Sequence, residues 1–424
     1  MCSASIFASI CAMSGGDISG KQFIRFVNKS LQLCAGISIL KLGLCLFFLH
    51  LATRLAYVWI ADLLHQPYDN EQLQLARNLA AGHGYVNPWA APTGPTAMYT
   101  PGHPLLMAAL FKIFGSGEIG SAGYAAFIIQ RILLSALTYA MLPLVAERLG
   151  WGRRTGFVAG LAGIFVPIHL LVEMRGITTG LEAFFMMLMA VMMHNAWESA
   201  DFNLRHALRF GLCQGTALLF NPFHLANSSG YLAVSLLRFA SHRRKVLLYF
   251  GFAFLLSAVI LSPWAVFNLQ RFGRLIWLRG DFGIQLYISL HPNVTVSFKE
   301  ALRTPGAYVA PNADVAACKE MAKVGEPAYS AARLADAVNF ARQDPGRIAG
   351  LIAKRFLRYW FPLTGRPLQT VMFFLLTACS LLGLADLWQK RDPARWLAST
   401  ILLCFPLLST YTSVIRSIDS AFTG

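Results

Sequence analysis

A Pro- and Gly-rich stretch at residues 65–104 holds the densest group of side chains that could do chemistry. It contains two acidic residues, Asp69 and Glu71, and the histidines His83 and His103. A carboxylate can accept the proton of a hydroxyl nucleophile, and turn-forming residues let irregular backbone fold over a cavity. The stretch follows an apolar segment long enough to cross a bilayer, so such a site would lie at a membrane surface.

Further charged residues lie near the ends of apolar segments, on the same predicted side of the membrane. Arg131 and Glu182 lie several residues inside apolar runs, where a charge is costly unless it faces a cavity or a partner. Guanidinium groups stabilise charge that grows on a phosphate while a carboxylate takes up a proton. The set therefore suits a reaction with an anionic leaving group. It comprises Arg54, Asp69, Glu71, Arg131, Glu173, Arg175, Glu182, Arg271, Arg274 and Arg416.

The composition is that of an integral membrane protein. Hydrophobic residues make up 56% of the 424 residues and charged residues 13%, against about 25% charged residues in soluble domains. The formal net charge is +16. Because Lys and Arg collect at alternate ends of apolar segments, this charge indicates membrane orientation and contact with membrane lipids, and it does not indicate a nucleic-acid partner.

Apolar runs predict nine membrane helices, of which the pair within residues 208–240 is short enough for a shallow hairpin. Segment 104–114 is predicted as a helix too short to cross, and 346–361 as an amphipathic helix in the membrane interface. The predicted membrane helices cover residues 37–60, 122–146, 155–172, 177–196, 208–220, 229–240, 246–267, 368–388 and 396–414.

Basic residues precede the first helix and mark every second connection after it, which places the N-terminus in the cytoplasm. Residues 1–36 are then a cytoplasmic segment whose first 20 residues are expected to be disordered, and 37–424 form a single transmembrane domain. Segments 62–103 and 268–345 are its outer loops, the second one polar and rich in turn formers. The expected fold is an all-α polytopic bundle with extracytoplasmic loops and interfacial helices.

The eight cysteines imply neither a disulfide framework nor a metal centre. Five of them lie within or beside apolar segments, where cysteine serves as a small core residue, and no pair has CxxC spacing. The P-loop signature GxxxxGK[ST] and the nucleophile signature GxSxG are also absent. We therefore expect no metal site and no soluble nucleotide donor. A lipid-linked donor would reach an outward-facing site from the membrane.

The order of several short motifs resembles the GT-C class of membrane glycosyltransferases. The motifs are TRLAYVW, YDNEQLQLARNLAAGHGY, MYTPGHPLLMAALFKIFG, GLEAFFMML, SPWAVFNLQRFGRL, DPGRIAGLIAKRFLRYWFP and SVIRSID. Within that class the chain is similar to the bacterial branch related to protein O-mannosyltransferases, lipid A aminoarabinose transferases and Rgt-like glycosyltransferases. The likeness runs from about residue 45 to the end.

The resemblance implies transfer of a sugar from a polyprenyl-phosphate donor to an acceptor on the outer face of the bacterial cell membrane. The acceptor would be a lipid, a glycan or a protein. The resemblance implies that the first outer loop supplies the acidic catalytic residue, which here is Asp69 with Glu71 beside it, and Glu182 matches a second acidic position. No cofactor is expected to be required, although a divalent cation is left open because some relatives use one.

Seven further residues are expected to contact substrates. Four are candidates for binding the donor phosphate, namely Arg271, Arg274, Arg131 and Arg416. Three are candidates for lining the substrate path, namely Tyr85, His103 and Glu173.

These residues also have structural interpretations. Asp69 could cap a helix over residues 70–80, since Asp is favoured at that position. Glu173 or Glu182 could form a buried pair with Arg131 or Arg175. Arg271 and Arg274 could be ordinary basic residues at a helix end, and a single histidine in such a loop is more often hydrogen-bonded than functional.

Some features depart from the family. Leu73 stands where relatives usually carry Tyr, Ser417 follows Arg416 where relatives have an Arg-Tyr pair, and the chain stops at Gly424, where relatives commonly continue through further membrane segments. C-terminal truncation, and a non-catalytic scaffold that kept the fold, are therefore left open. The main alternative is a transporter or flippase of an anionic or glycosylated lipid, for which pseudo-repeated halves would be expected, and we find no internal repeat.

Overall fold

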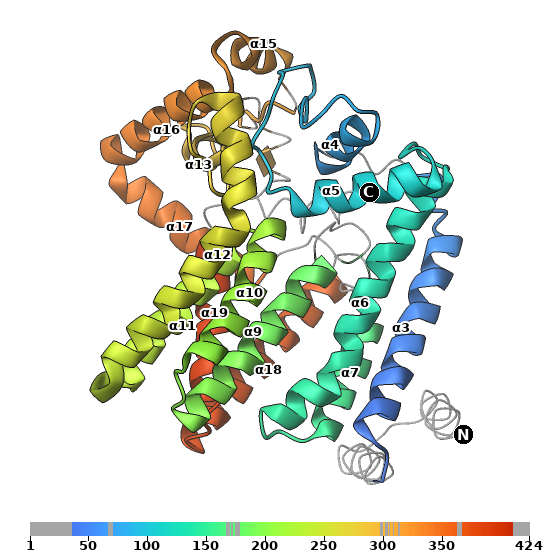
Figure 1. Cartoon of the computed structure of the whole chain (residues 1–424), viewed down its shortest axis with the longest axis vertical. Coiled ribbons are helices and arrows are strands. Elements are labelled where there is room, and N and C mark those ends of the chain that lie inside the picture. Colours follow the sequence, from blue (N-terminus) through green and yellow to red (C-terminus); the bar gives the residue numbers. More distant parts are fainter. Residues whose placement is uncertain are drawn as a thin grey trace.

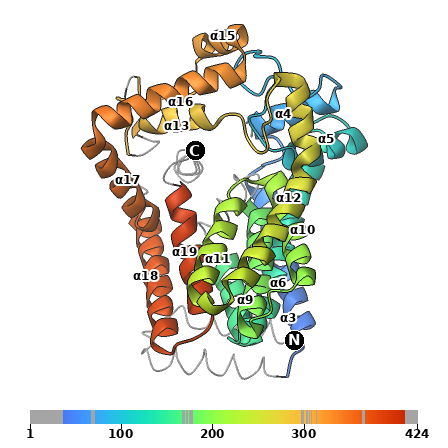
Figure 2. The ribbon, with the colours of Figure 1, turned by 60° about the vertical axis from the view of Figure 1, so that its left-hand side comes forward.

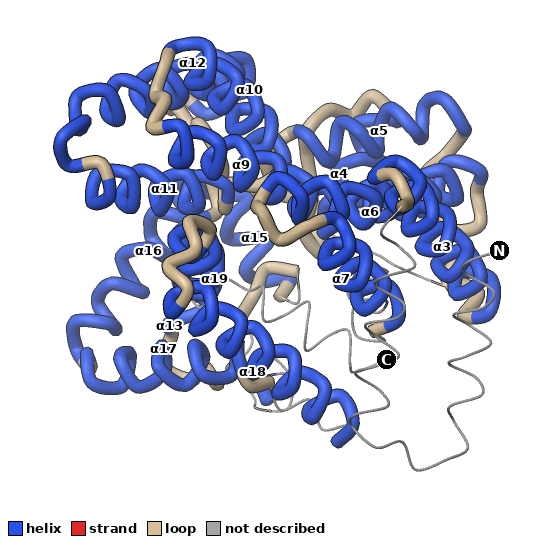
Figure 3. The backbone as a smooth tube through the Cα atoms, turned by 90° about the horizontal axis from the view of Figure 1, so that it is seen from below, coloured by secondary structure: helices blue, strands red, loops and turns tan. Residues whose placement is uncertain are grey.

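The structure, a computed structural model, is all-α in the part of the chain that it describes. The described residues are 36–66, 71–166, 170, 173, 179–296, 300, 301, 304, 306, 307, 309–312, 314–362 and 367–409. They form helices joined by turns (Figure 3), and their only β-type pairing is one bridge between Val86 and Pro95. The predicted all-α class is confirmed for these residues.

One group of helices lies side by side as a bundle, and a second group forms a cap over one end of it (Figures 1 and 2). The bundle consists of α3 (Ile39–Ile60), α6 (Ala122–Arg148), α7 (Arg153–Phe165), α9 (Thr179–Ser199), α10 (Leu204–Phe220), α11 (His224–Arg238), α12 (Arg243–Phe272), α18 (Pro367–Gln389) and α19 (Arg395–Ser409). The cap consists of α4 (Glu71–Ala80), α5 (Gly102–Phe114), α13 (Phe282–Leu290), α15 (Val315–Val324) and α16 (Glu326–Gln343), and α17 (Pro345–Trp360) leads from the cap to α18.

Four helices of the described chain are long and apolar enough to cross a membrane. They are α3, α6, α12 with the short turn η2 (Ala240–His242) before it, and α18. The other predicted spans are shorter or less apolar. Helix α7 ends at Phe165 because Val166 is extended, as expected for a residue that precedes a proline in the sequence. The predicted short hairpin becomes α10 and α11, of 17 and 15 residues.

The connections rich in basic residues lie at the end of the molecule opposite the cap. Figure 1 shows the turns between α6 and α7, between α9 and α10, and between α18 and α19 at this end. The first of these turns carries Arg148, Arg153 and Arg154, and the last carries Lys390 and Arg391. The basic connections, which alternate with other connections along the sequence, thus lie together at one end of the bundle.

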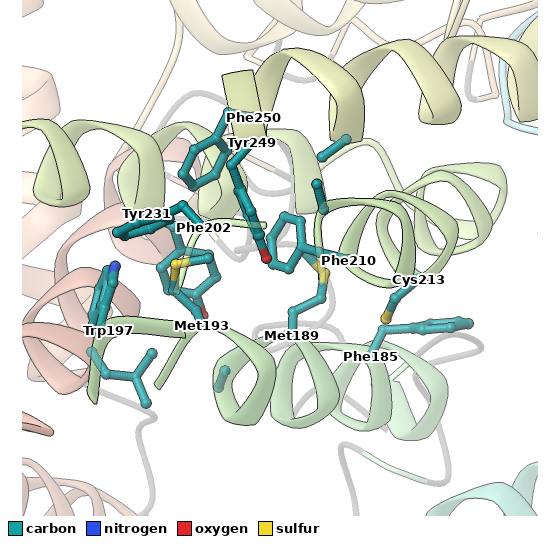
Figure 4. Packing of buried hydrophobic residues seen from close by; sticks show 14 of the residues in the cluster. Phe185, Met189, Met193, Trp197, Phe202, Phe210, Cys213, Tyr231, Tyr249 and Phe250 are labelled. Carbon is teal, nitrogen blue, oxygen red and sulfur yellow. The ribbon is translucent and has the colours of Figure 1, made fainter. Parts of the chain in front are cut away.

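Helices α9, α10, α11 and α12 pack around an aromatic core (Figure 4), which includes Phe210, Tyr231 and Phe250. A glycine allows two of these helices to approach closely. At Gly211 in α10, an added Cβ would lie 2.7 Å from the backbone oxygen of Ala253 in α12. Small residues at such crossings let the backbones of two helices touch, which is typical of helix pairs in membranes.

Segment 268–345 is more helical than its turn-forming residues indicated, since it contains α13, α15 and α16. Helices α13 and α16 cross with no space for a side chain between them. A Cβ added at Gly283 would lie 1.9 Å from the backbone oxygen of Ser330, and the Gly283 amide donates to the Ser330 hydroxyl. Part of the predicted outer loop is therefore a packed unit of its own.

Replacing Gly283 with Ala is expected to separate α13 from α16, because the clash is with backbone and no rotamer can relieve it. We expect a loss of about 1–3 kcal/mol in the free energy of unfolding, as for other overpacked sites. Gly350→Ala in α17 is the matched control, since no atom lies within 4 Å of its added Cβ. Thermal unfolding in detergent measures the stability of both variants. If Gly283→Ala unfolded at the same temperature as Gly350→Ala, the close crossing of α13 and α16 would be contradicted.

Candidate functional site

Helix α3 contributes two buried polar residues to a contact with Glu173. His50 and Arg54 are four residues apart, so they share one face of a largely apolar helix, and they are 0% and 1% exposed. The Arg54 Nε donates to Glu173 Oε2 over 2.8 Å, and His50 Nε2 lies 3.0 Å from the same oxygen. Arg54 also donates to the backbone oxygen of Ile164 in α7 over 2.9 Å.

Helix α6 faces the same carboxylate with a stripe of polar residues spaced by four. The Tyr139 hydroxyl donates to Glu173 Oε1 over 2.8 Å, and Ser135 Oγ lies 3.2 Å from His50 Nε2. Arg131 Nη2 donates to the backbone oxygen of Glu173 over 2.7 Å. We call this group the Glu173 cluster, consisting of His50, Arg54, Arg131, Ser135, Tyr139 and Glu173.

The Glu173 cluster stabilises the charge of the buried Glu173 carboxylate. Both carboxylate oxygens of Glu173 already accept hydrogen bonds, and one of the donors is the guanidinium of Arg54. A buried ion pair persists only when the groups around it satisfy its remaining hydrogen-bonding capacity, and this one meets that condition at the carboxylate. A carboxylate engaged in this way is a poor general base, so its chemistry is electrostatic and structural.

Three residues of the Glu173 cluster, Ser135, Tyr139 and Glu173, line a cavity between α6, α9, α18 and α19. The cavity has a volume of about 560 Å³. Ser135, Thr138, Tyr139 and Glu173 provide its polar lining, and the rest of the wall is mostly apolar. Such a cavity matches a ligand that has a long apolar part and one polar group. The apolar lining includes Leu142, Val145, Met186, Met187, Phe373 and Ile401.

Glu182 and His103 lie near the cap end of the bundle. Glu182, in the first turn of α9, accepts a 2.5 Å hydrogen bond from Asn221 at the end of α10. His103 is buried in α5, with its ring edge-on to Phe220. Burial, with a smaller effect of Arg131, lowers the pKa of His103 to about 3, so its imidazole is neutral at pH 7.

The first outer loop is tied to the long outer segment. Glu71, the first residue of α4, accepts a hydrogen bond of 2.9 Å from the Asn312 side chain. Tyr85 is buried, its hydroxyl donates to the backbone oxygen of Tyr99 over 3.0 Å, and its ring lies edge-on to Trp264 of α12. Tyr85 thus belongs to the apolar core of the loop, and it does not line the cavity.

The predicted site residues do not all gather in one place. Glu173 and Arg131 come together, whereas Arg271 and Arg274 lie exposed at the end of α12, where Arg271 stacks over Phe267. Asp69, Arg175 and Arg416 lie outside the described residues, and so does the predicted role of Asp69 as a helix cap. The predicted pairing of a buried glutamate with an arginine is found for Glu173, but its carboxylate partner is Arg54.

Sequence reasoning missed His50 and Tyr139 entirely. The signal was present, because a His and an Arg four residues apart in an apolar helix indicate a shared buried partner. It also missed Glu326, which is 1% exposed at the start of α16. The Glu326 carboxylate accepts from the Thr96 hydroxyl over 2.5 Å and from the Ala97 amide over 2.8 Å. An acidic residue at a helix start ordinarily indicates an exposed cap, so no local pattern around Glu326 indicates its burial.

Within the described residues, no group of three or more His, Cys, Asp or Glu side chains could hold a metal ion. Comparisons with family models, curated proteins and solved structures find no match to this chain.

Proposed function

We propose that the chain is a multi-pass protein of the bacterial cell membrane that transfers a sugar from a polyprenyl phosphate to a lipid, glycan or protein acceptor outside the cytoplasm. The observation that carries this proposal is the apolar cavity with residues of the Glu173 cluster in its wall. A donor with an isoprenoid chain and a phosphate has the same division into apolar and polar parts. The order of motifs that resembles GT-C glycosyltransferases supports the same reaction.

The arrangement of charges supports an outward-facing site. Four helices have the length and apolar character of membrane spans, and the turns rich in Lys and Arg lie opposite the cap. Basic connections stay in the cytoplasm. With the basic end inside, the cap formed by the first outer loop and the long outer segment lies on the far side of the membrane, where a lipid-linked donor is available and a nucleotide sugar is not.

In the proposed reaction the isoprenoid chain lies in the cavity and the phosphate faces the arginines. Arg131, from the Glu173 cluster, is one candidate for binding the phosphate, and Arg271, Arg274 and Arg416 are the others. Asp69 accepts the proton of the acceptor hydroxyl, whose oxygen forms a bond to the anomeric carbon. The bond from that carbon to the phosphate oxygen breaks with inversion, and polyprenyl phosphate leaves with the electron pair. Glu71 and Glu182 are the further acidic candidates, and no cofactor is needed.

Asp69→Asn is expected to lower the rate of sugar transfer by about 100-fold, because the acceptor hydroxyl loses its general base. The measurement uses purified protein in lipid with a radiolabelled polyprenyl-phosphate sugar. Asp62→Asn is the matched control, since Asp62 is an exposed acidic residue at the start of the same loop. Unchanged transfer would remove Asp69 from the mechanism, and lipid translocation without cleavage of the sugar would favour a flippase.

A further inference from the structure

Helix α17 presents two parallel stripes on its exposed surface. Ala349, Ala353 and Leu357 are exposed and spaced by four residues, so they form an apolar stripe. Lys354, which is exposed, and Arg358, which is half-buried, are also spaced by four and form a basic stripe beside it. The helix contains four basic residues and no acidic residue, so its surface charge is entirely positive. An apolar stripe beside a basic one is typical of helices that lie at a membrane surface.

The residues at the end of α17 indicate its level relative to the membrane surface. It ends in Tyr359 and Trp360, and the apolar helix α18 begins at Pro367. Tyr and Trp are enriched where a membrane meets water. The Trp360 backbone oxygen accepts a 2.6 Å hydrogen bond from Thr377 in α18, which holds the two helices together. Figure 2 shows α17 running from the cap down to α18, at the edge of the molecule.

Helix α17 is also fastened to the cap. Arg355, the basic residue on its buried side, donates to the backbone oxygens of Ser289 and Thr295 over 2.8 and 3.1 Å. Ser289 belongs to α13, which shares an apolar cluster with the first outer loop through Ile288 and Trp89. The two hydrogen bonds of Arg355 therefore connect α17 to the cap.

We propose that α17 lies on the outer surface of the membrane and binds the headgroups of anionic phospholipids through Lys354 and Arg358, and that Arg355 passes this attachment to the cap. The apolar stripe enters the boundary between headgroups and acyl chains, and the two cations meet the lipid phosphates. This inference rests on the membrane placement in the proposed function, but it does not depend on sugar transfer.

The test compares wild-type protein in nanodiscs of phosphatidylcholine with nanodiscs in which about one third of the lipid is phosphatidylglycerol. Each basic residue at an anionic surface contributes roughly five-fold, so amide hydrogen exchange across residues 345–360 should slow about 25-fold in the anionic discs. The double variant Lys354→Gln/Arg358→Gln should lose this dependence on lipid. The matched control Lys319→Gln/Lys323→Gln removes the same charge from exposed positions of α15 and should keep it.

Exchange in α13 in phosphatidylcholine discs checks that each variant has folded. Equal wild-type exchange in the two lipids would overturn the proposal, as would a control that responds like the α17 variant. Failure of the chain to co-elute with nanodiscs would refute the membrane placement on which both proposals rest. Failure of sugar transfer alone would leave the lipid contact intact.

Discussion

Arg54→Leu is expected to lower the free energy of unfolding by about 3–5 kcal/mol, because it leaves the buried Glu173 carboxylate without its cationic partner. The substitution also removes the donor to the Ile164 backbone oxygen, which fastens α7 to α3. Denaturant titration of the purified protein in detergent measures the change. The loss should be larger than for any single surface substitution on the same helix.

Two further variants separate loss of the ion pair from loss of packing. The double variant Arg54→Leu/Glu173→Leu should regain most of the lost stability, since no buried charge then remains without a partner. Lys41→Leu is the matched control, because Lys41 is an exposed cation on α3. If the double variant were as unstable as Arg54→Leu, the ion pair would not be the source of the effect.

Glu326→Gln is expected to remove a pH dependence from the stability of the cap. Burial, and to a lesser degree the nearby Asp281 carboxylate, raise the pKa of Glu326 from 4.5 to about 7. The folded chain therefore binds a proton between these pH values that the unfolded chain has released. Wild-type stability should fall as the pH rises from 4.5 through 7, by about 3 kcal/mol in total, and change no further above that range.

Glutamine should remove this dependence because it resembles the neutral acid. Its carbonyl can accept from the Ala97 amide and its NH₂ can donate to Thr96, so the contacts between the first outer loop and α16 remain. The charged and titratable groups around Glu326 are Asp281, paired with Arg279, and the tyrosines Tyr85 and Tyr99. Unfolding at pH 5 and pH 8 is the measurement.

Glu118→Gln, at an exposed acidic residue in the turn after α5, is the control for the Glu326 experiment and should keep the wild-type pH dependence. A Glu326→Gln protein that loses stability between pH 5 and pH 8 as steeply as wild type would assign the effect to another group.

Hydrophobic periodicity was a good guide wherever a helix is long or strongly amphipathic. The prediction for 346–361 differs from α17 by one residue at each end, and 37–60 and 122–146 correspond closely to α3 and α6. It was a poor guide in segment 268–345. There, α13 and α16 are stabilised by their mutual crossing at Gly283. This tertiary contact overrides the local preference of the turn-forming residues, so it cannot be predicted from them.

The candidate site was only partly predictable, for a similar reason. A charge inside an apolar run indicates a buried partner, and this correctly marked Arg131 as a residue that faces other polar groups. The identity of that partner depends on which helices are neighbours. Glu173 is 119 residues from Arg54, and Glu326 is 230 residues from Thr96, so neither contact leaves a local pattern in the sequence.

Helix α18 is exposed along most of its length. Thr377 is its one buried residue, while Leu368 and Leu382 are 74% and 70% exposed. In a bilayer such a segment satisfies its peptide groups internally and needs no protein neighbour in order to form. With the membrane placement proposed above, α18 would enter the bilayer as an independent step of biogenesis, before it docks against α19. A lysine in place of Leu382 would consequently act at the translocon, by opposing partition of the segment into lipid, and would leave the packed interior untouched.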